Sequence, residues 1–355
     1  MVRRLAGLAG FVILVLAVTW LIRSAPLSDW LDDEGGSSLP GPVATALAAG
    51  EANTAGDGDV TGSRSLIVLP DDGQNAILSE LEAATESIDL YIYLLPSDEV
   101  IDRLEAAHDR GVRVRVILEQ DPFGGGNSNA EAFEALERAG IYVRWSSERF
   151  RFSHIKAIVI DGRVALIMTL NLSRTALNGN REFAVLSTRP GDVHELSMLF
   201  EADWSGESYS PSGSMVTSPD NSVAVLRELI SSAEQTIEIY AEVVRDEGIR
   251  QDLIAATNRD VTVKILVPTS PSSDDMLIYR ELEASGAQVK LLTRNYSHAK
   301  AIIIDSTVAF VGSQNLTSTS LNDNREAGIV LDDASNVGRL VGVFREDWES
   351  SADVD

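Results

Sequence analysis

Two nearly identical ten-residue segments each carry one histidine and one lysine. Residues 153–162 read SHIKAIVIDG, and residues 297–306 read SHAKAIIIDS. The whole chain of 355 residues has only four histidines and four lysines. An imidazole can act as a nucleophile or transfer a proton near neutral pH, and an ammonium group can bind the oxygens of a phosphoryl group. The two segments therefore supply paired groups suited to phosphoryl transfer.

The spacing within each segment places the histidine and the lysine on one face of a strand. Successive side chains of a strand point to opposite faces, so His154 and Lys156 point the same way and Asp161 points the other way. The residues AIVI between them predict a strand that is buried on both faces. Asp161 followed by Gly162 is typical of a hairpin turn, which indicates a structural tether and not an acid or base. The second segment repeats the pattern with His298, Lys300 and Asp305.

Hydroxyl, amide and carboxylate side chains follow each segment at matched distances. The two hydroxyls and two amides, which we expect to bind phosphate oxygens together with the lysines, are Thr169, Asn171, Ser313 and Asn315. Glu182 and Glu326 each follow their histidine by 28 residues. A carboxylate that accepts a hydrogen bond from one imidazole nitrogen fixes the tautomer. The other nitrogen is then free to attack phosphorus or to donate a proton.

Either segment alone would be weak support for catalysis. A single histidine near a strand end is most often a hydrogen-bonded core residue, and a single lysine is most often solvated. Two copies in register with asparagine and glutamate, in a chain so poor in histidine and lysine, favour a shared catalytic site.

Most of the chain repeats along with these segments. Residues 87–95 recur as 236–244, and residues 111–118 recur as 260–267, both at an offset of 149. The offset shortens to 146 after an additional glycine-rich stretch in the first copy, DPFGGGNSN, and it is 144 from His154 onward. Two copies with so long a period indicate two homologous halves and not a solenoid. We expect them to pack about a pseudo-twofold axis, with a site at the seam that receives one segment from each half.

Strand and helix patterns alternate in both copies, which is the signature of an α/β fold. We predict a first half at residues 63–208 and a second half at residues 209–355. Residues 26–62 are rich in Gly, Ser, Ala, Pro and Asp and are expected to form a flexible linker.

The N-terminal residues 1–25 predict a membrane anchor. Residues 5–22 contain no charged side chain and are long enough to cross a bilayer as a helix. The run ends in TWLIR instead of the small residues of a cleavage site, so we favour an uncleaved anchor over a cleaved signal of a secreted protein. Arg3 and Arg4 precede the run, which places the start in the cytoplasm and the catalytic part outside the cell membrane.

The composition excludes several kinds of site and disfavours one kind of partner. The chain has no cysteine, so disulfides, zinc thiolates and iron–sulfur clusters are excluded. Four histidines leave little for a metal site, and we expect neither a metal nor another cofactor. The net charge of −25 repels polyanions and disfavours nucleic acid as a partner. Such a charge is typical either of a host adapted to high salt or of an ordinary acidic protein.

The doubled H-x-K-x4-D motif, with an asparagine and then a glutamate after each copy, resembles the phospholipase D superfamily over about residues 64–350. The resemblance implies two α/β halves with mixed central sheets. It also implies a metal-independent phosphodiesterase or phosphatidyltransferase, of the phospholipase D or cardiolipin synthase kind, with a covalent phosphohistidine. The motif aspartates, Asp161 and Asp305, belong to the catalytic set of that family.

The resemblance also implies a role for each group. His154 would be the nucleophile and His298 the acid. The two lysines and the two asparagines would hold phosphate, while Glu182 and Glu326 would orient the histidines. One departure is that the Gly-Ser before the asparagine is kept as Gly312-Ser313 but is Met168-Thr169 in the first half. The missing glycine is expected to alter how closely the backbone approaches phosphate.

Three functions remain open at this point. The first is a membrane-anchored enzyme with a phospholipid substrate, for which no oligomer is required because both half-sites lie in one chain. The second is a nuclease of the same superfamily, which needs the same catalytic groups and a basic groove. The third is a catalytically silent scaffold that only binds phosphate, and the retention of every polar motif position argues against it.

Overall fold

The structure, a computed structural model, describes residues 62–354. The predicted anchor at residues 1–25, and the predicted linker up to residue 61, lie outside these residues. Within residues 62–354, none of the helices combines the length and the apolar character that crossing a membrane requires.

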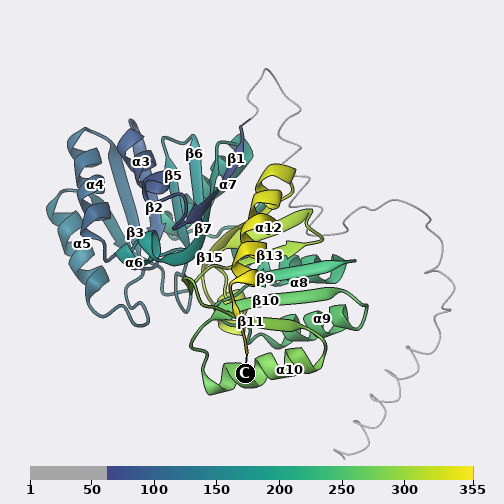
Figure 1. The fold of residues 1–355 in the computed structure, drawn as a ribbon. Helices are drawn as coiled ribbons and strands as arrows, with labels where there is room; N and C mark the ends of the chain where they lie inside the picture. The colour runs from purple at the N-terminus through teal and green to yellow at the C-terminus, as the bar shows by residue number, and fades with distance from the viewer. Residues whose placement is uncertain (1–61, 355) are drawn as a thin grey trace, which may run out of the picture. The chain divides into compact units, whose positions relative to one another are not determined.

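The first half is built on a mixed sheet whose strands alternate with helices (Figure 1). The strand order is β1-β7-β6-β5-β2-β3-β4, in which β2, β3 and β4 are parallel and the other neighbours are antiparallel. The elements are β1 (Arg64–Leu69), α3 (Asn75–Ala83), β2 (Ser87–Ile92), α4 (Asp98–Asp109), β3 (Arg113–Leu118), α5 (Ser128–Arg138), β4 (Tyr142–Trp145), β5 (Lys156–Ile160), β6 (Val164–Met168), α6 (Arg174–Asn178), β7 (Asn180–Ser187) and α7 (Pro190–Ser205).

The second half repeats this order of elements. Its strand order is β16-β11-β10-β9-β13-β14-β15-β8, again with a parallel part (β9, β10, β11) and an antiparallel part. The elements are β8 (Met215–Ser218), α8 (Ser222–Ser232), β9 (Thr236–Tyr240), α9 (Glu247–Thr257), β10 (Thr262–Pro268), α10 (Ser273–Ala284), β11 (Gln288–Leu292), β12 (Tyr296–Ser297), β13 (Ala301–Ile304), β14 (Val308–Gly312), α11 (Ser318–Asn322), β15 (Glu326–Leu331), α12 (Ala334–Glu349) and β16 (Ala352–Asp353). The predicted pair of α/β halves with mixed sheets is confirmed.

Buried side chains form three clusters that explain how the layers hold together. One cluster lies within each half, between the sheet and the helices on its outer side, which are α3, α4 and α5 in the first half and α8, α9 and α10 in the second (Figure 1). The third cluster contains residues from both halves, including Tyr91 and Tyr240. In α12, Val337, Leu340 and Phe344 recur at helical spacing and are fully buried in this cluster. The apolar stripe of α12 therefore helps to join the halves.

Candidate active site

Next to each histidine, a short backbone segment of one half pairs with the backbone of the other half. In β12, Ser297 pairs with Arg181 at the start of β7. The reciprocal contact is a bridge between Ser153 and Arg325. Each serine immediately precedes a histidine, and each arginine immediately precedes a glutamate. The exchange therefore sets the histidine of one half beside the glutamate of the other half.

The two histidines are oriented by carboxylates across the seam. Nδ1 of His154 lies 2.9 Å from Oε2 of Glu326, and Nδ1 of His298 lies 2.8 Å from Oε1 of Glu182. Both glutamates are fully buried. Sequence spacing identified these four residues as a group, but it did not reveal that each glutamate serves the histidine of the opposite half.

The buried glutamates remain ionised. Burial by itself would raise the pKa of each carboxyl, but the facing histidine and the nearby lysine lower it below its usual value. An anionic carboxylate can only accept a hydrogen bond, so the proton of each ring is held on Nδ1. Nε2 of each imidazole is thus left for chemistry.

The electrostatic surroundings of His154 involve both halves. Burial lowers the pKa of this imidazole, and the charges of Lys156 and Lys300 lower it further, which outweighs the opposite effect of Glu326. The lowered pKa favours the neutral imidazole, which carries a proton on Nδ1 and a free electron pair on Nε2. A nucleophile requires this state.

The two motif lysines are buried beside the histidines. Nζ of Lys156 donates to the backbone oxygen of His154 at 2.8 Å, and Nζ of Lys300 donates to that of His298 at 2.6 Å. Burial lowers the pKa of Lys156 to about 7 even though neighbouring glutamates oppose the shift. A bound phosphate would supply the negative charge that favours the protonated form of this amine.

The amide groups at the matched positions each have a buried oxygen without a hydrogen-bond partner among the described residues. The two oxygens are Oδ1 of Asn171 and Oδ1 of Asn315. Buried polar atoms are seldom left without a partner unless they take part in function. Each amide also carries an NH2 donor, so both asparagines can serve an incoming phosphoryl group.

The two hydroxyls expected to bind substrate are placed behind the glutamates instead. Thr169 is fully buried, and its Oγ1 donates to Oε2 of Glu182 at 2.6 Å. The backbone N–H of Phe183 donates to Oγ1 of Thr169 at 2.9 Å. Ser313 is also fully buried, and its hydroxyl helps to lower the pKa of Glu326. This placement makes both hydroxyls supports of the orienting carboxylates.

The motif aspartates lie at the far end of their strands. The carboxylate of Asp161 accepts hydrogen bonds from the backbone N–H groups of Thr85, Glu86 and Ser87 at 2.7–3.2 Å. Asp305 accepts the corresponding bonds from residues 234–236 at 2.7–2.9 Å. Both aspartates have the positive φ of a tight hairpin. The structure therefore places them as tethers of the hairpin to the start of β2 or β9, as the turn pattern indicated, and away from the reacting groups.

The glycine that the second half keeps before Ser313 is closely packed. A Cβ added at Gly312 would lie 2.6 Å from the Cα of Gly328 and 2.6 Å from the ring of Phe310. The glycine is therefore required by packing inside the second half. Its counterpart Met168 pairs with Ala184 in the first half and is fully buried in the apolar core. The two positions that differ, Gly312 and Met168, are thus both closely packed within their own halves.

Two buried ion pairs, which sequence reasoning missed, join the halves next to the glutamates. Arg181 contacts Asp347 and Arg325 contacts Asp203, each with Nε to Oδ2 at 2.7 Å. All four side chains are 1–2% exposed. The signal was present, since both partners recur at the same offset of 144 residues. Because each arginine precedes a glutamate, the pairs hold the backbone next to Glu182 and Glu326 in place.

Metal binding has no obvious location in the part of the chain that the structure describes. No group of three or more His, Asp or Glu side chains in this part is arranged to hold a metal ion.

Comparison with known proteins agrees with this geometry. A family model described as "Cardiolipin synthase, PLD-like domain" matches residues 77–204 and 226–348, which is more than half of the chain. A cardiolipin synthase 2 of Bacillus cereus is 25% identical over 331 residues, which cover 80% of this chain and 64% of the relative. The chain thus spans less than two thirds of the length of that relative.

Two solved structures share the fold at low sequence identity. Polyphosphate kinase from Porphyromonas gingivalis superposes with a TM-score of 0.63 at 18% identity, over 81% of this chain and 50% of that chain. Phosphatidylserine synthase from Haemophilus influenzae also gives 0.63, at 12% identity, over 81% of this chain and 85% of that chain. From the family match and the doubled motif, we conclude that this chain belongs to the cardiolipin synthase family of phospholipase D-like domains, within the phospholipase D superfamily.

Proposed function

We propose that the chain is a phospholipid phosphodiesterase or phosphatidyltransferase of cardiolipin synthase type that works through a covalent phosphohistidine. The observation that carries this proposal is the pair of histidine–glutamate contacts across the seam, with a buried lysine beside each histidine. Such a set provides two reactive imidazole nitrogens and two cations at one place.

The reaction would proceed in two steps. Nε2 of His154 attacks phosphorus, a phosphorus–nitrogen bond forms, and the bond to the departing alcohol breaks while His298 gives that alcohol a proton. In the second step His298 removes a proton from water or from an acceptor alcohol, whose oxygen displaces His154. The lysines and asparagines would bind the phosphoryl oxygens, where charge is concentrated in the transition state.

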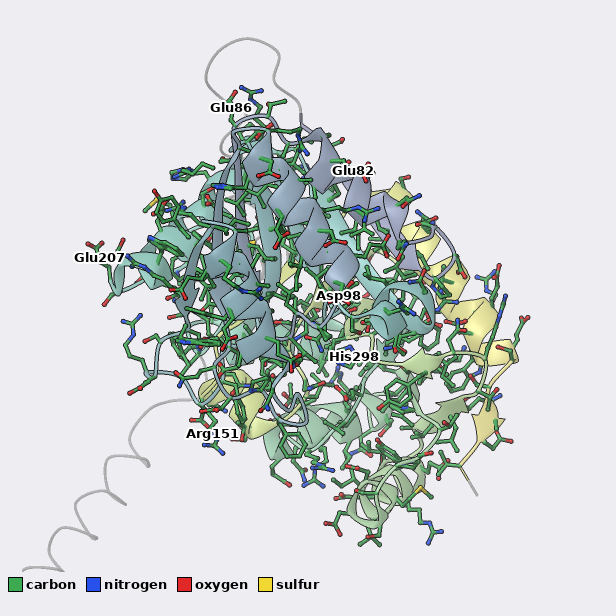
Figure 2. All side chains as sticks on the ribbon, turned by 90° about the vertical axis from the view of Figure 1, so that its left-hand side faces the viewer. Glu82, Glu86, Asp98, Arg151, Glu207 and His298 are labelled. Carbon is green, nitrogen blue, oxygen red and sulfur yellow. The ribbon has the colours of Figure 1, made fainter. Side chains whose placement is uncertain are left out.

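The net negative charge of the chain and the predicted N-terminal membrane anchor favour a lipid substrate over nucleic acid. The net charge of −25 would oppose the approach of a polyanion. In Figure 2 the labelled Glu86 and Glu207 lie at the outer edge of the view, whereas His298 lies in its interior. An anchor at residues 1–25 and a linker at residues 26–62 would hold the site close to the bilayer on the outer side of the cell membrane. Tethering of this kind raises the local concentration of lipid.

The test compares two substrates at one salt concentration that keeps the protein folded. The full chain is incubated with phosphatidylglycerol vesicles and glycerol, and separately with single-stranded DNA, and products are followed by mass spectrometry. We expect lipid turnover that is lost in both His154→Ala and His298→Ala. Faster cleavage of DNA, lost in the same variants, would identify a nuclease. Phosphate binding without turnover of either substrate would identify a silent scaffold.

A further inference from the structure

The two half-sites differ in the residue that contacts the motif lysine. The repeat offset of 149 residues aligns Tyr93 of the first half with Glu242 of the second. In the first half, Nζ of Lys156 lies 5.1 Å from the centre of the Tyr93 ring. In the second half, Nζ of Lys300 lies 3.1 Å from Oε2 of Glu242. One lysine therefore faces an aromatic ring and the other faces a carboxylate.

The two histidines contact the same two residues as the lysines, a tyrosine in the first half-site and a glutamate in the second. The ring of Tyr93 meets the ring of His154 edge to face, with 4.5 Å between their centres. Oε2 of Glu242 lies 3.7 Å from Nε2 of His298. Nε2 is the nitrogen of His298 that Glu182 does not use. The carboxylate thus lies beside the nitrogen that would exchange a proton with a substrate.

The groups that contact the two histidines differ in charge. His298 is faced by Glu182 from β7, by Glu242 from the segment after β9, and by Lys300 from its own segment, with the neutral Tyr296 nearby. His154 is faced by one carboxylate, that of Glu326, and is acted on by both lysines, with Tyr93 as the aromatic neighbour. A carboxylate beside Nε2 favours a proton on that nitrogen, and only the second half-site has one in contact with it.

Glu242 is itself an anion under working conditions. Burial acts to raise the pKa of its carboxyl, but Lys300 and His298 hold that pKa well below the usual value. The carboxylate is more exposed than the orienting glutamates, at 28% against 0%.

From this geometry we propose that Glu242 is a positioning residue that keeps the transferable proton on Nε2 of His298, so that the two half-sites take different roles. His298 is then the acid in the first step, and His154, beside neutral Tyr93, is the nucleophile. As the bond between phosphorus and the departing oxygen breaks, the proton moves from Nε2 of His298 to that oxygen, and Glu242 stays ionised throughout. The inference rests on the proposed function, because it assigns roles within that reaction.

The test uses two lipids that differ only in the departing group, phosphatidylglycerol and phosphatidyl-p-nitrophenol. A glycerol alkoxide needs a proton to leave, whereas p-nitrophenolate does not. We expect Glu242→Gln to lower kcat/KM for phosphatidylglycerol at least about tenfold more than for the p-nitrophenyl lipid, since general acid catalysis contributes roughly 100-fold or more. The matched control is Tyr93→Phe, which should change both rates by the same factor. Equal losses for both lipids in Glu242→Gln would overturn the proposal.

A second measurement identifies the nucleophile directly. With the p-nitrophenyl lipid, His298→Ala should release about one equivalent of p-nitrophenol in a burst and retain a phosphatidyl group on His154, detected by mass spectrometry. His154→Ala should show no burst. The reverse pattern would overturn the role assignment. If the wild-type protein turns over neither lipid, the proposed function fails and this inference fails with it, which differs from an active enzyme with equal losses.

Discussion

Nδ1 of His154 lies 2.9 Å from Oε2 of Glu326, a residue 172 positions further along the chain and in the other half. His298 and Glu182 make the same contact in the opposite direction at 2.8 Å. Neither half contains both members of a pair. A complete site therefore forms only when the two halves fold against each other.

Substituting either orienting glutamate should damage the step that depends on the opposite histidine. We expect Glu326→Gln and Glu182→Gln each to lower kcat by roughly 100-fold or more, because the imidazole loses the acceptor that fixes its tautomer. Steady-state kinetics with phosphatidylglycerol checks this, with circular dichroism as the control for folding. Rates close to the wild type in either variant would contradict the role of the pair.

Phosphate binding should weaken as the pH rises through the pKa of Lys156. That pKa is lowered to about 7, so the free protein loses the positive charge of this amine above that pH. Calorimetric titration with inorganic phosphate should give a lower affinity at about pH 8.5 than at about pH 6. Lys156→Arg keeps its charge over this range and should flatten the dependence. An unchanged slope in that variant would assign the effect to another group.

Activity should persist in excess chelator. The buried lysines and the asparagine amides would supply the charge and hydrogen bonds that a metal ion supplies in other phosphoryl-transfer sites. The measurement is the turnover of phosphatidylglycerol before and after dialysis against EDTA, at constant ionic strength. Loss of turnover that a divalent cation restores would overturn this mechanism.

Removing a hairpin tether should affect stability more than chemistry. Asp161→Asn should lower the free energy of unfolding by about 1–3 kcal/mol, because charge-assisted bonds to three backbone N–H groups are weakened. These backbone bonds lower the pKa of Asp161 against the effect of burial. The stabilisation is therefore present above the ordinary pKa of an aspartate and is lost as the pH falls through the lower pKa of the folded state. Urea unfolding at neutral and acidic pH tests both parts. Equal stability of the two proteins at neutral pH would contradict the first part, and a difference that does not change with pH would contradict the second.

Gly312 should tolerate no added methyl group. Gly312→Ala should destabilise the protein by about 1–3 kcal/mol, because a Cβ would overlap Gly328 and the ring of Phe310. The matched control is Gly338→Ala in α12, where a Cβ meets nothing within 4 Å and alanine favours the helix by about 0.5–1 kcal/mol. Opposite signs for the two variants in denaturant unfolding are expected. A neutral effect of Gly312→Ala would show that the strands can separate at that point.

Local sequence patterns predicted the parts of the fold that depend on neighbouring residues. Residues 156–160, with their continuous apolar run, form β5, and the Asp161-Gly162 turn closes the hairpin to β6. The repeat predicted that the second half would match. These features follow from side-chain periodicity and turn chemistry, which act over a few residues.

The relationships that the sequence did not reveal depend on contacts between distant segments. A spacing of 28 residues from histidine to glutamate is the same in both halves, so it cannot tell which glutamate reaches which histidine. That choice is made by the pairing of Ser297 with Arg181 and of Ser153 with Arg325. Glu242 was missed for a related reason. It is one of two glutamates in the stretch TIEIYAEVV, and only the folded structure shows that it contacts Lys300.

The crossed arrangement of glutamates also ties together the evolution of the two halves. A substitution that displaces Glu182 disturbs the orientation of His298, and one that displaces Glu326 disturbs the orientation of His154. The buried pairs Arg181–Asp347 and Arg325–Asp203 extend the same dependence to the surrounding backbone. If the halves arose by duplication, neither copy could be lost or change its role without inactivating the other. Selection therefore acts on the two halves together.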